Sequence, residues 1–406
     1  PSTMADTSFS VPQGEFDLIR YPPTRDPNLR AWDAADEFML AHLAEVAAEH
    51  SVARVFVVND AFGALTVGAM AALGEGTDGA RVHFVSDSHT ATLAMRQNVE
   101  RNGLPRPTEW GVSADGTWED VAGGASAEAA SGEGIDVVLI KVPKALALLE
   151  VELVGLRAAV RDAGVIVGGA MTRDVHGSTV KLFEESLGPT RTTRARKKAR
   201  LLLSELDPAL APAAPRPSLF ELGIGSANLV NLPGVFSARR LDKGTRALLH
   251  ALPGIADGAD VIDLGCGNGA LGLAVLLKNP TAQVTFIDAS RLAVASAELS
   301  VRRAFPDLGR GGSPDPVFRV ADCLDGLPGD SADLILCNPP FHQGFDTSID
   351  ISIKFVEAMH RHLNPAGICL VVSNIFLPYE KHAAHLFSDC QILEEANGFK
   401  IIQFSK

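Results

Sequence analysis

ADVIDLGCGNGALGLAVLLK, residues 259–278, passes from an apolar run into a glycine-rich turn and then into a second apolar run. The first run has the length of a buried strand, and the second has the length of a helix. Glycines between a strand and a helix let backbone amides approach a ligand, and the helix N-terminus adds partial positive charge. This stretch therefore predicts the start of a nucleotide-binding α/β domain.

The next predicted strand, residues 283–287, ends in Asp288. A carboxylate at that place can accept hydrogen bonds from both hydroxyls of a ribose. Gly265, Gly267 and Ala270 also satisfy the G-x-G-x-x-A pattern of NAD-dependent dehydrogenases. The glycines alone leave both NAD and S-adenosylmethionine open as cofactors.

The segment Asn338-Pro339-Pro340-Phe341 follows a strand-like run and separates these two classes. The prolines stiffen the turn and hold Asn338 extended. Asn338 Oδ1 and the Pro339 carbonyl can then accept the two hydrogens of an exocyclic amine, and Phe341 can stack on a base. The plain alternative is an Asn-Pro turn after a strand. In this context the segment favours a methyltransferase, with Asn338, Pro339 and Phe341 as its catalytic residues.

Several residues are candidates for binding S-adenosylmethionine. Asp322 ends the run at residues 317–321, where the adenine is expected to lie, and Gly244 and Thr245 are expected near the methionine end of the cofactor. The full set is Asp263, Gly265, Gly267, Gly269, Asp288, Asp322, Gly244 and Thr245.

The first half of the chain repeats this plan in a weaker form. Residues 59–65 align with residues 263–269, Asp87 aligns with Asp288, and Lys141 aligns with Asn338. We therefore expect two tandem Rossmann-like class I methyltransferase domains of α/β class, produced by an internal duplication. The predicted divisions are a degenerate domain at residues 1–207, a linker rich in proline and alanine at 208–217, and a catalytic domain at 218–406.

The first copy lacks the residues that the chemistry requires. It keeps Gly63 but places bulky Phe62 in the turn, and Lys141 and Lys144 replace the amine acceptors. Lysine only donates hydrogen bonds, so this copy is expected to bind neither the cofactor nor the amine. Its role is either to pack on the active copy or to dock RNA. Asp36 and Glu37 are expected to be solvated.

Composition limits the possible partners. The 406 residues carry a net charge of −13 with a pI of about 5.3, which argues against broad nucleic-acid binding. The run Arg191–Arg200 is basic against this background, although such runs are often only solvated surface. The residues expected to contact RNA are Lys141, Lys144, Arg194, Arg196, Lys197 and Lys198.

The sequence offers no sign of a membrane span or a signal peptide. Its five cysteines form no C-x-x-C pair, and the histidines lack carboxylates at metal-ligand spacing. We therefore expect a cytoplasmic monomer without a metal site.

The strings quoted above, together with Ala31–Glu37, Leu146–Glu150 and Val235–Ser237, are similar to those of the large-subunit ribosomal RNA methyltransferase G family. The resemblance runs through most of the chain. It implies a bacterial cytoplasmic enzyme that methylates N2 of one guanosine in 23S rRNA, with a first domain that helps to hold the RNA. Two alternatives stay open: a guanine-N2 methyltransferase acting on 16S rRNA, and a non-catalytic RNA-binding factor for ribosome assembly.

Overall fold

The computed structural model describes residues 6–24, 26–74, 81–112, 118–120, 134–157, 159–213, 215–236, 240–309, 314–339, 345–376, 379–383, 385–396 and 398–406. The chain divides into two compact units, Pro1–Pro215 and Arg216–Lys406, which are called domain 1 and domain 2. The division falls inside the range 208–217 for which the sequence predicts a linker.

Domain 1 opens with a two-stranded hairpin and continues as an α/β sheet. Its elements in chain order are β1 (Ser8–Val11), β2 (Gly14–Asp17), α1 (Ala34–Glu49), β3 (Arg54–Val58), α2 (Ala64–Leu73), β4 (Arg81–Val85), α3 (His89–Arg101), β5 (Thr108–Val112), β6 (Trp118–Asp120), β7 (Ile135–Lys141), α5 (Leu146–Arg157), β8 (Val160–Met171), η2 (Thr172–Asp174), α6 (Gly177–Ser186), β9 (Thr190–Thr192) and β10 (Ala199–Ser204).

Domain 2 follows the same plan. Its elements are β11 (Ser218–Glu221), β12 (Asn228–Asn231), α7 (Lys243–His250), β13 (Asp260–Leu264), α8 (Ala270–Lys278), β14 (Gln283–Asp288), α9 (Arg291–Ala304), β15 (Val317–Val320), β16 (Ala332–Cys337), α10 (Phe345–His362), β17 (Leu363–Asn374), α11 (Tyr379–Ala383), β18 (Asp389–Ala396) and β19 (Phe399–Ser405).

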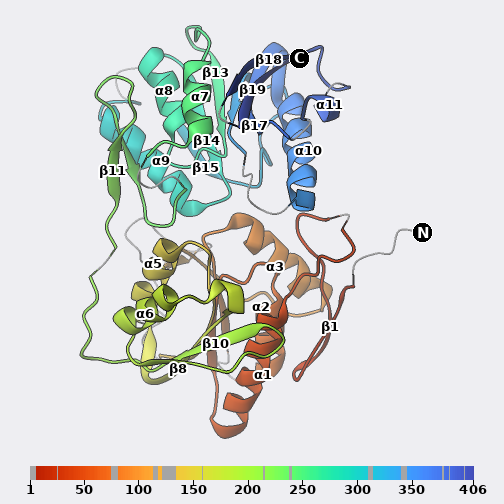
Figure 1. Ribbon diagram of the computed structural model, residues 1–406, viewed down its shortest axis with the longest axis vertical. Helices are drawn as coiled ribbons and strands as arrows, with labels where there is room; N and C mark the ends of the chain where they lie inside the picture. Colours follow the sequence, from red (N-terminus) through yellow and green to blue (C-terminus); the bar gives the residue numbers. More distant parts are fainter. Residues whose placement is uncertain are drawn as a thin grey trace. The chain divides into compact units, whose positions relative to one another are not determined.

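The two large sheets share one strand order. In domain 2 it is β15-β14-β13-β16-β17-β19-β18, and in domain 1 it is β5-β4-β3-β7-β8-β10-β9 with β6 added beside β5. The five strands from β15 to β17 are parallel, and β19 returns antiparallel to β17. In Figure 1, α7, α8 and α9 lie on one side of the domain 2 sheet, and α10 and α11 lie on the other. The predicted pair of tandem Rossmann-like methyltransferase folds is confirmed.

The apolar faces explain this layering. One cluster joins the domain 2 sheet to buried side chains of α7, α8 and α9, among them Leu248, Leu273 and Val301. A second cluster covers the other face with Val356 and Met359 of α10. The parallel strands are buried on both faces, which is why their sequences are continuously apolar. Among the helices that the structure describes, none has the length and apolar character needed to cross a membrane.

The structure corrects the alignment of the two halves. Strand pairing places Arg54 and Asp260 at equivalent positions, because they face Arg81 and Gln283, the first residues of the second strands. Gly63 is thereby equivalent to Gly269, each being the N-cap of the helix that follows. The sequence alignment had placed Gly63 with Gly267, because it matched polar residues at the strand end rather than the helix start.

The second strand needs a similar correction. The residue equivalent to Asp288 is Ser86, not Asp87, since the N-cap serines Ser88 and Ser290 of α3 and α9 each follow two residues later. Ser86 Oγ accepts from Ser88 N at 3.0 Å, and Asp288 Oδ1 accepts from Ser290 N at 2.9 Å. Both side chains brace the same turn, but the serine carries no negative charge.

One glycine in each turn is required by helix packing. Gly269 has a φ of 82°, and a Cβ built on it would lie 2.9 Å from Ala297 Cα. Gly63 has a φ of 91°, and its Cβ would lie 2.8 Å from Met95 Cα. A side chain at Gly269 would push α8 away from α9, and a side chain at Gly63 would push α2 away from α3.

We predict that Gly63→Ala and Gly269→Ala each lower the free energy of unfolding of their own domain by about 1–3 kcal/mol, because backbone strain and overpacking act together. Urea unfolding followed by circular dichroism measures the loss. Gly177→Ala and Gly254→Ala are matched controls, since a Cβ there meets no atom of the described residues within 4 Å. Equal unfolding midpoints for all four variants would show that the close contact is not limiting.

Candidate active site

The glycine turn joins β13 to α8 at the carboxyl edge of the domain 2 sheet. Gly265 and Gly267 have φ values of 70° and 54°. Among the described residues, a Cβ on Gly267 would meet no atom within 4 Å, and one on Gly265 would meet only the Asn338 carbonyl oxygen, at 3.9 Å. The described part of the chain therefore leaves room above these two glycines, whereas Gly269 serves packing. This open, amide-lined turn fits the close approach of a nucleoside-type cofactor.

Asp288 ends β14 beside this turn and is only partly buried. Its Oδ2 accepts from Gly267 N at 3.0 Å, and its Oδ1 accepts from Ser290 N at 2.9 Å. Two backbone amides thus fix the plane of the carboxylate. A carboxylate oxygen can accept more than one hydrogen bond, which suits the ribose hydroxyls that the sequence assigns to Asp288.

Asp322 lies one loop further along the same edge and is buried. The Ala321 amide donates to the Asp288 carbonyl oxygen at 3.0 Å, so the two acidic residues come from adjoining backbone. Lys354 of α10 donates to Asp322 Oδ2 and forms an ion pair with it. The sequence did not point to Lys354, because no local spacing signals a partner that lies 32 positions further along the chain.

Asp263 lies behind the turn. It is fully buried, and its Oδ2 accepts from Gly272 N of α8 at 2.8 Å. Burial raises the pKa of this carboxyl to about 8. Its predicted contact with the cofactor stays a prediction, since the hydrogen bond that the structure gives it holds α8 against β13. Cys266 in the turn is also buried, and burial raises the pKa of its thiol well above the usual range.

Asn338 begins the loop after β16, beside the glycine turn. Its Nδ2 donates to Asp242 Oδ2 at 3.1 Å and to Thr245 Oγ1 at 2.8 Å. Its Oδ1 is buried and has no hydrogen bond to any residue that the structure describes. An unpaired buried acceptor is costly unless a ligand satisfies it. A ligand that donates a hydrogen bond would satisfy this acceptor.

The other predicted residues of this site divide into two groups. Gly244 and Thr245 form the start of α7 and lie against Asn338. Pro339 is buried directly after Asn338. Phe341 lies outside the described residues, so its stacking role stays a prediction. No cluster of three or more His, Cys, Asp or Glu side chains in the described ranges is placed to hold a metal ion.

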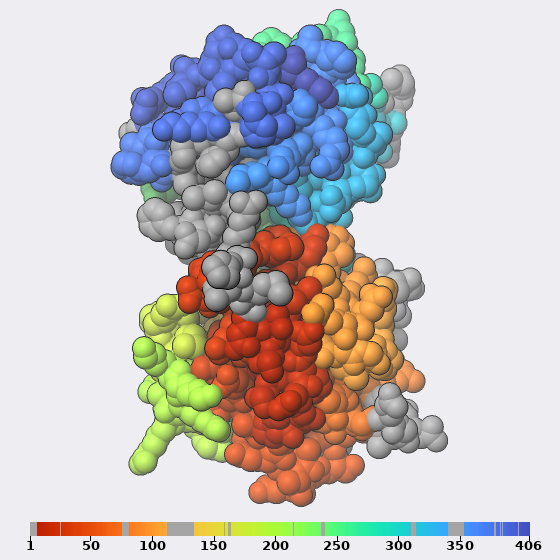
Figure 2. All heavy atoms as spheres, turned by 90° about the vertical axis from the view of Figure 1, so that its right-hand side faces the viewer, coloured from red at the N-terminus to blue at the C-terminus, as the bar shows by residue number. Residues whose placement is uncertain are grey.

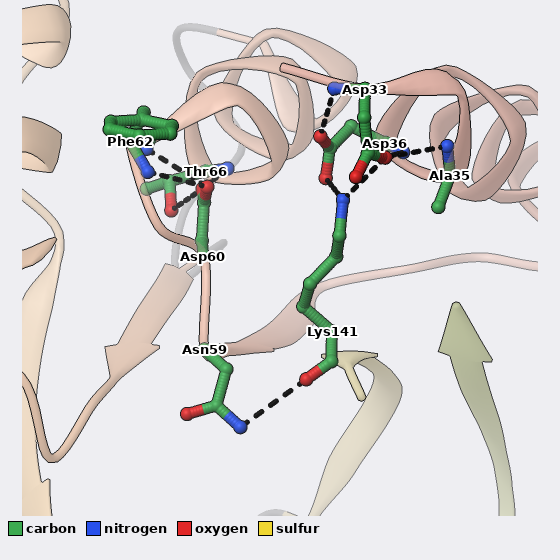
Figure 3. Close-up of polar contacts among 9 residues, drawn as sticks. Asp33, Ala35, Asp36, Asn59, Asp60, Phe62, Thr66 and Lys141 are labelled. Atoms are coloured by element: carbon green, nitrogen blue, oxygen red, sulfur yellow. Dashed lines mark hydrogen bonds and ion pairs between the residues drawn. The ribbon is translucent and has the colours of Figure 1, made fainter. Parts of the chain in front are cut away.

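Domain 1 carries a changed version of the Asn338 site (Figure 3). Lys141 occupies the position of Asn338 at the end of β7. Its ammonium pairs with Asp33 Oδ1 at 2.7 Å and with Asp36 Oδ1 at 2.6 Å. Against the effect of burial, these two carboxylates raise the pKa of Lys141. The predicted solvation of Asp36 is wrong, because this carboxyl is buried and ion-paired.

In domain 1 a polar side chain also replaces one glycine of the domain 2 turn. Asn59 takes the place of Gly265 and keeps a left-handed φ of 59°. Its Nδ2 donates to Glu152 Oε2 at 2.7 Å, as well as to the Lys141 carbonyl. Glu152 is fully buried, and burial raises its pKa well above the usual range. Side chains thus stand where domain 2 has only backbone.

The predicted RNA-contact residues other than Lys141 are exposed. Lys144 lies just before α5, and the others lie in and before the turn between β9 and β10. In Figure 2, yellow-green atoms, the colour of residues near 190–200, lie at the surface of domain 1. The exposed residues are Lys144, Arg194, Arg196, Lys197 and Lys198.

The turn at Lys197 and Lys198 has an unusual conformation. Arg196 and Ala199 exchange backbone hydrogen bonds of 2.9 and 2.8 Å across it. Lys197 and Lys198 have φ values of 48° and 64°, as in a type I′ turn, for which Asn-Gly is the usual sequence. Lysine rarely adopts this conformation, so the turn holds both residues in an unfavourable backbone geometry. Lys197 also pairs with Glu37 at 2.6 Å, an exposed contact of little energetic value.

Comparison with known proteins agrees with this geometry. Residues 6–208 match the RLMG N-terminal domain family, and residues 226–403 match the methyltransferase small domain family. The solved structure of the T. thermophilus 16S rRNA N2 methyltransferase RsmC, in complex with AdoMet and guanosine, superposes with a TM-score of 0.72 at 23% identity. It covers 100% of this chain, and the match spans 99% of that chain. At this identity the match establishes the fold.

Curated relatives cover the chain almost completely. The ribosomal RNA large subunit methyltransferase G of Streptomyces coelicolor is 40% identical over 98% of this chain and 100% of its own length. That of Aeromonas salmonicida is 38% identical over 100% of this chain and 99% of its own length. The family expected from the sequence is thus confirmed: this chain belongs to the ribosomal RNA large subunit methyltransferase G family.

Proposed function

We propose that this protein transfers a methyl group from S-adenosylmethionine to the exocyclic N2 of a guanosine in 23S rRNA. The observation that carries the proposal is Asn338 Oδ1, a buried acceptor without a partner in the described structure, beside the glycine turn. The names of the full-length relatives support a large-subunit rRNA substrate. The protein is proposed to act in the cytoplasm as a monomer, with residues 218–406 as its catalytic part and residues 208–217 as linker.

The residues of domain 2 suit S-adenosylmethionine. Gly265 and Gly267 would let the cofactor approach the backbone of the turn. Asp288 would accept hydrogen bonds from the ribose hydroxyls, and Asp322 would lie at the adenine. When bound, this cofactor supplies an electrophilic methyl group on a sulfonium. The remaining chemistry falls to the protein and concerns the nucleophile.

Guanine N2 is a weak nucleophile, because its lone pair is delocalised into the purine ring. Asn338 Oδ1 and the Pro339 carbonyl would accept its two hydrogens and draw the nitrogen toward tetrahedral geometry. The lone pair then localises on the nitrogen, and preorganised dipoles stabilise the charge that develops there. No strong base is required, because the proton leaves after the nitrogen has become cationic. N2 of a paired guanine is shielded, so the target must be unpaired or flipped out.

Domain 1 is proposed to hold the RNA. Its exposed cations at Arg194, Arg196, Lys197 and Lys198 contrast with the net charge of −13 of the whole chain. The strained Lys197-Lys198 turn keeps both charges at a hairpin tip, where a phosphate backbone can reach them. Lys141 is withdrawn from this surface, because its ammonium is bound to two carboxylates.

Asn338→Ala is expected to lower kcat by about a hundredfold or more, as the loss of a preorganised polar group at a reacting centre does. S-adenosylmethionine affinity should stay unchanged. The measurement is N2-methylguanosine formation in rRNA from a strain that lacks this gene, with digestion products mapped by mass spectrometry. Asn279→Ala is the matched control, since the Asn279 side chain bonds Ile255, Asp257 and Thr281 at the opposite edge of the sheet. Methylation of 16S rather than 23S rRNA, or of neither, would contradict the proposed substrate.

Asp288→Ser should weaken S-adenosylmethionine binding by about 1.5–3 kcal/mol, the range for a hydrogen bond to a charged group. The serine keeps an acceptor for Ser290 N, as Ser86 does for Ser88 N in domain 1, so the turn should survive. Isothermal calorimetry gives the affinity, and an excess of NAD serves as the competitor control. Displacement of the bound cofactor by NAD would instead favour a dehydrogenase site.

Changing Arg194, Arg196, Lys197 and Lys198 to Ala should weaken RNA binding and flatten its dependence on salt concentration. The double variant Lys197→Asn, Lys198→Gly separates charge from structure. It gives the turn its preferred residues and should raise the melting temperature while lowering RNA affinity. Arg81 and Arg106, which are exposed at the start of β4 and just before β5, supply a control pair. Unchanged RNA affinity in the Asn-Gly variant would leave this turn without a role in binding.

A further inference from the structure

We infer that Asp242 and Thr245 are positioning residues for Asn338, and that they keep its Oδ1 directed at the methyl-accepting amine. This inference rests on the proposed function. It differs from the sequence-based assignment of Thr245 to the methionine end of the cofactor. The structural basis is a pair of hydrogen bonds of 3.1 and 2.8 Å from Asn338 Nδ2.

The chemistry of these bonds fixes the orientation of the amide. A carboxylate only accepts hydrogen bonds, so the group that faces Asp242 Oδ2 must be the Asn338 NH2. A flipped amide would place Oδ1 against the Asp242 carboxylate, and the two oxygens would repel. Asp242 thus selects one of two rotamers of nearly equal shape. The oxygen of the selected rotamer is the acceptor that has no partner in the described structure.

Asp242 is itself held by the helix that it caps. Its Oδ2 accepts from Gly244 N at 2.9 Å and from Thr245 N at 3.2 Å, at the start of α7. These bonds satisfy two amides that the helix cannot satisfy internally. Leu248 and Leu249 of α7 are buried in the core, so the cap is anchored to the domain. The Asp242 carboxylate therefore connects Asn338 to a helix that is anchored in the core.

Gly244 completes this arrangement. A Cβ there would lie 2.7 Å from Val372 Cγ1, 3.0 Å from Asp242 Oδ2 and 3.4 Å from Asn338 Oδ1. Any side chain would therefore press on the cap and on the catalytic amide together. The glycine allows the helix start to approach the ends of β16 and β17.

Domain 1 has an equivalent link between a helix N-cap and a strand end, and this is an independent observation. Asp33 caps α1 by accepting from Ala35 N and Asp36 N, as Asp242 caps α7. Asp36 stands where domain 2 has Thr245, and Lys141 stands where domain 2 has Asn338. The polar link from helix cap to strand end has thus persisted although the amine acceptor is gone. Where a cation replaced the amide, a second carboxylate replaced the hydroxyl.

The link also strengthens the acceptor. A carboxylate that accepts from an amide NH2 polarises the amide, and its oxygen becomes a better acceptor through hydrogen-bond cooperativity. Asp242 therefore acts on Asn338 through both orientation and charge.

Thr245→Val tests orientation, because it removes the hydroxyl while conserving shape. We expect kcat to fall about tenfold to a hundredfold, the scale for a misplaced reacting group. The dissociation constant of S-adenosylmethionine should change less than about twofold. Thr245→Ser, which restores the hydroxyl, should recover the turnover. Thr281→Val is the matched control, since this hydroxyl bonds at the opposite edge of the same sheet.

A double-mutant cycle separates positioning from general stability. In the Asn338→Ala background, Thr245→Val should cause no further loss of kcat, since there is no amide left to orient. Asp242→Asn keeps an acceptor but removes the charge, and should lie between wild type and Thr245→Val. Additive losses in the cycle, normal turnover of Thr245→Val, or a loss confined to cofactor affinity would each overturn the inference. An inactive wild type would instead refute the proposed function, and this inference with it.

Discussion

Each domain depends on a close contact between the glycine that starts one helix and the backbone of the next helix along the chain. At Gly269 and Gly63 the helix after the first strand comes so near the helix after the second strand that a Cβ would lie within 3 Å of its backbone. Both residues also require a left-handed φ. The first two strands pair in parallel, so their carboxyl ends also lie together at the edge of the sheet where this contact is made. The glycine turn and the acidic residue that braces it therefore lie side by side, and the candidate site is built on that edge.

The two domains share one scaffold and the polar links between its elements, but they differ in the polar groups at the carboxyl edge of the sheet. In domain 2 the turn offers backbone at Gly265 and Gly267, a carboxylate at Asp288 and an amide at Asn338. In domain 1 the equivalent elements offer the Asn59 side chain with its bond to Glu152, the Ser86 hydroxyl and an ion-paired Lys141. The groups that join elements survive as polar links. The groups proposed to face a ligand in domain 2 are replaced in domain 1 by groups that bond within the protein.

Sequence reasoning succeeded where local chemistry dictates geometry. The strand-glycine-helix pattern, the duplication and the exposure of Arg194–Lys198 were readable because each depends on residues near one another in the chain. It misaligned Gly63 and Asp87, because side-chain identity is a poor guide to strand register. It predicted a solvated Asp36, which is instead buried and paired with Lys141. Those two residues are 105 positions apart, and no local signal shows that they pair.

The family, the fold class and the predicted amine-acceptor motif can be read from sequence patterns, because strand periodicity, glycine spacing and proline stiffness act over a few residues. The direction in which the Asn338 amide points depends instead on how the domain packs. The N-cap signal of Asp242 is visible in the sequence, but its bond to Asn338 spans 96 positions. That bond exists because parallel strands end at one edge of the sheet, where the start of α7 meets the end of β16. The orientation of a side chain at such a meeting point is a property of the packed domain rather than of any segment.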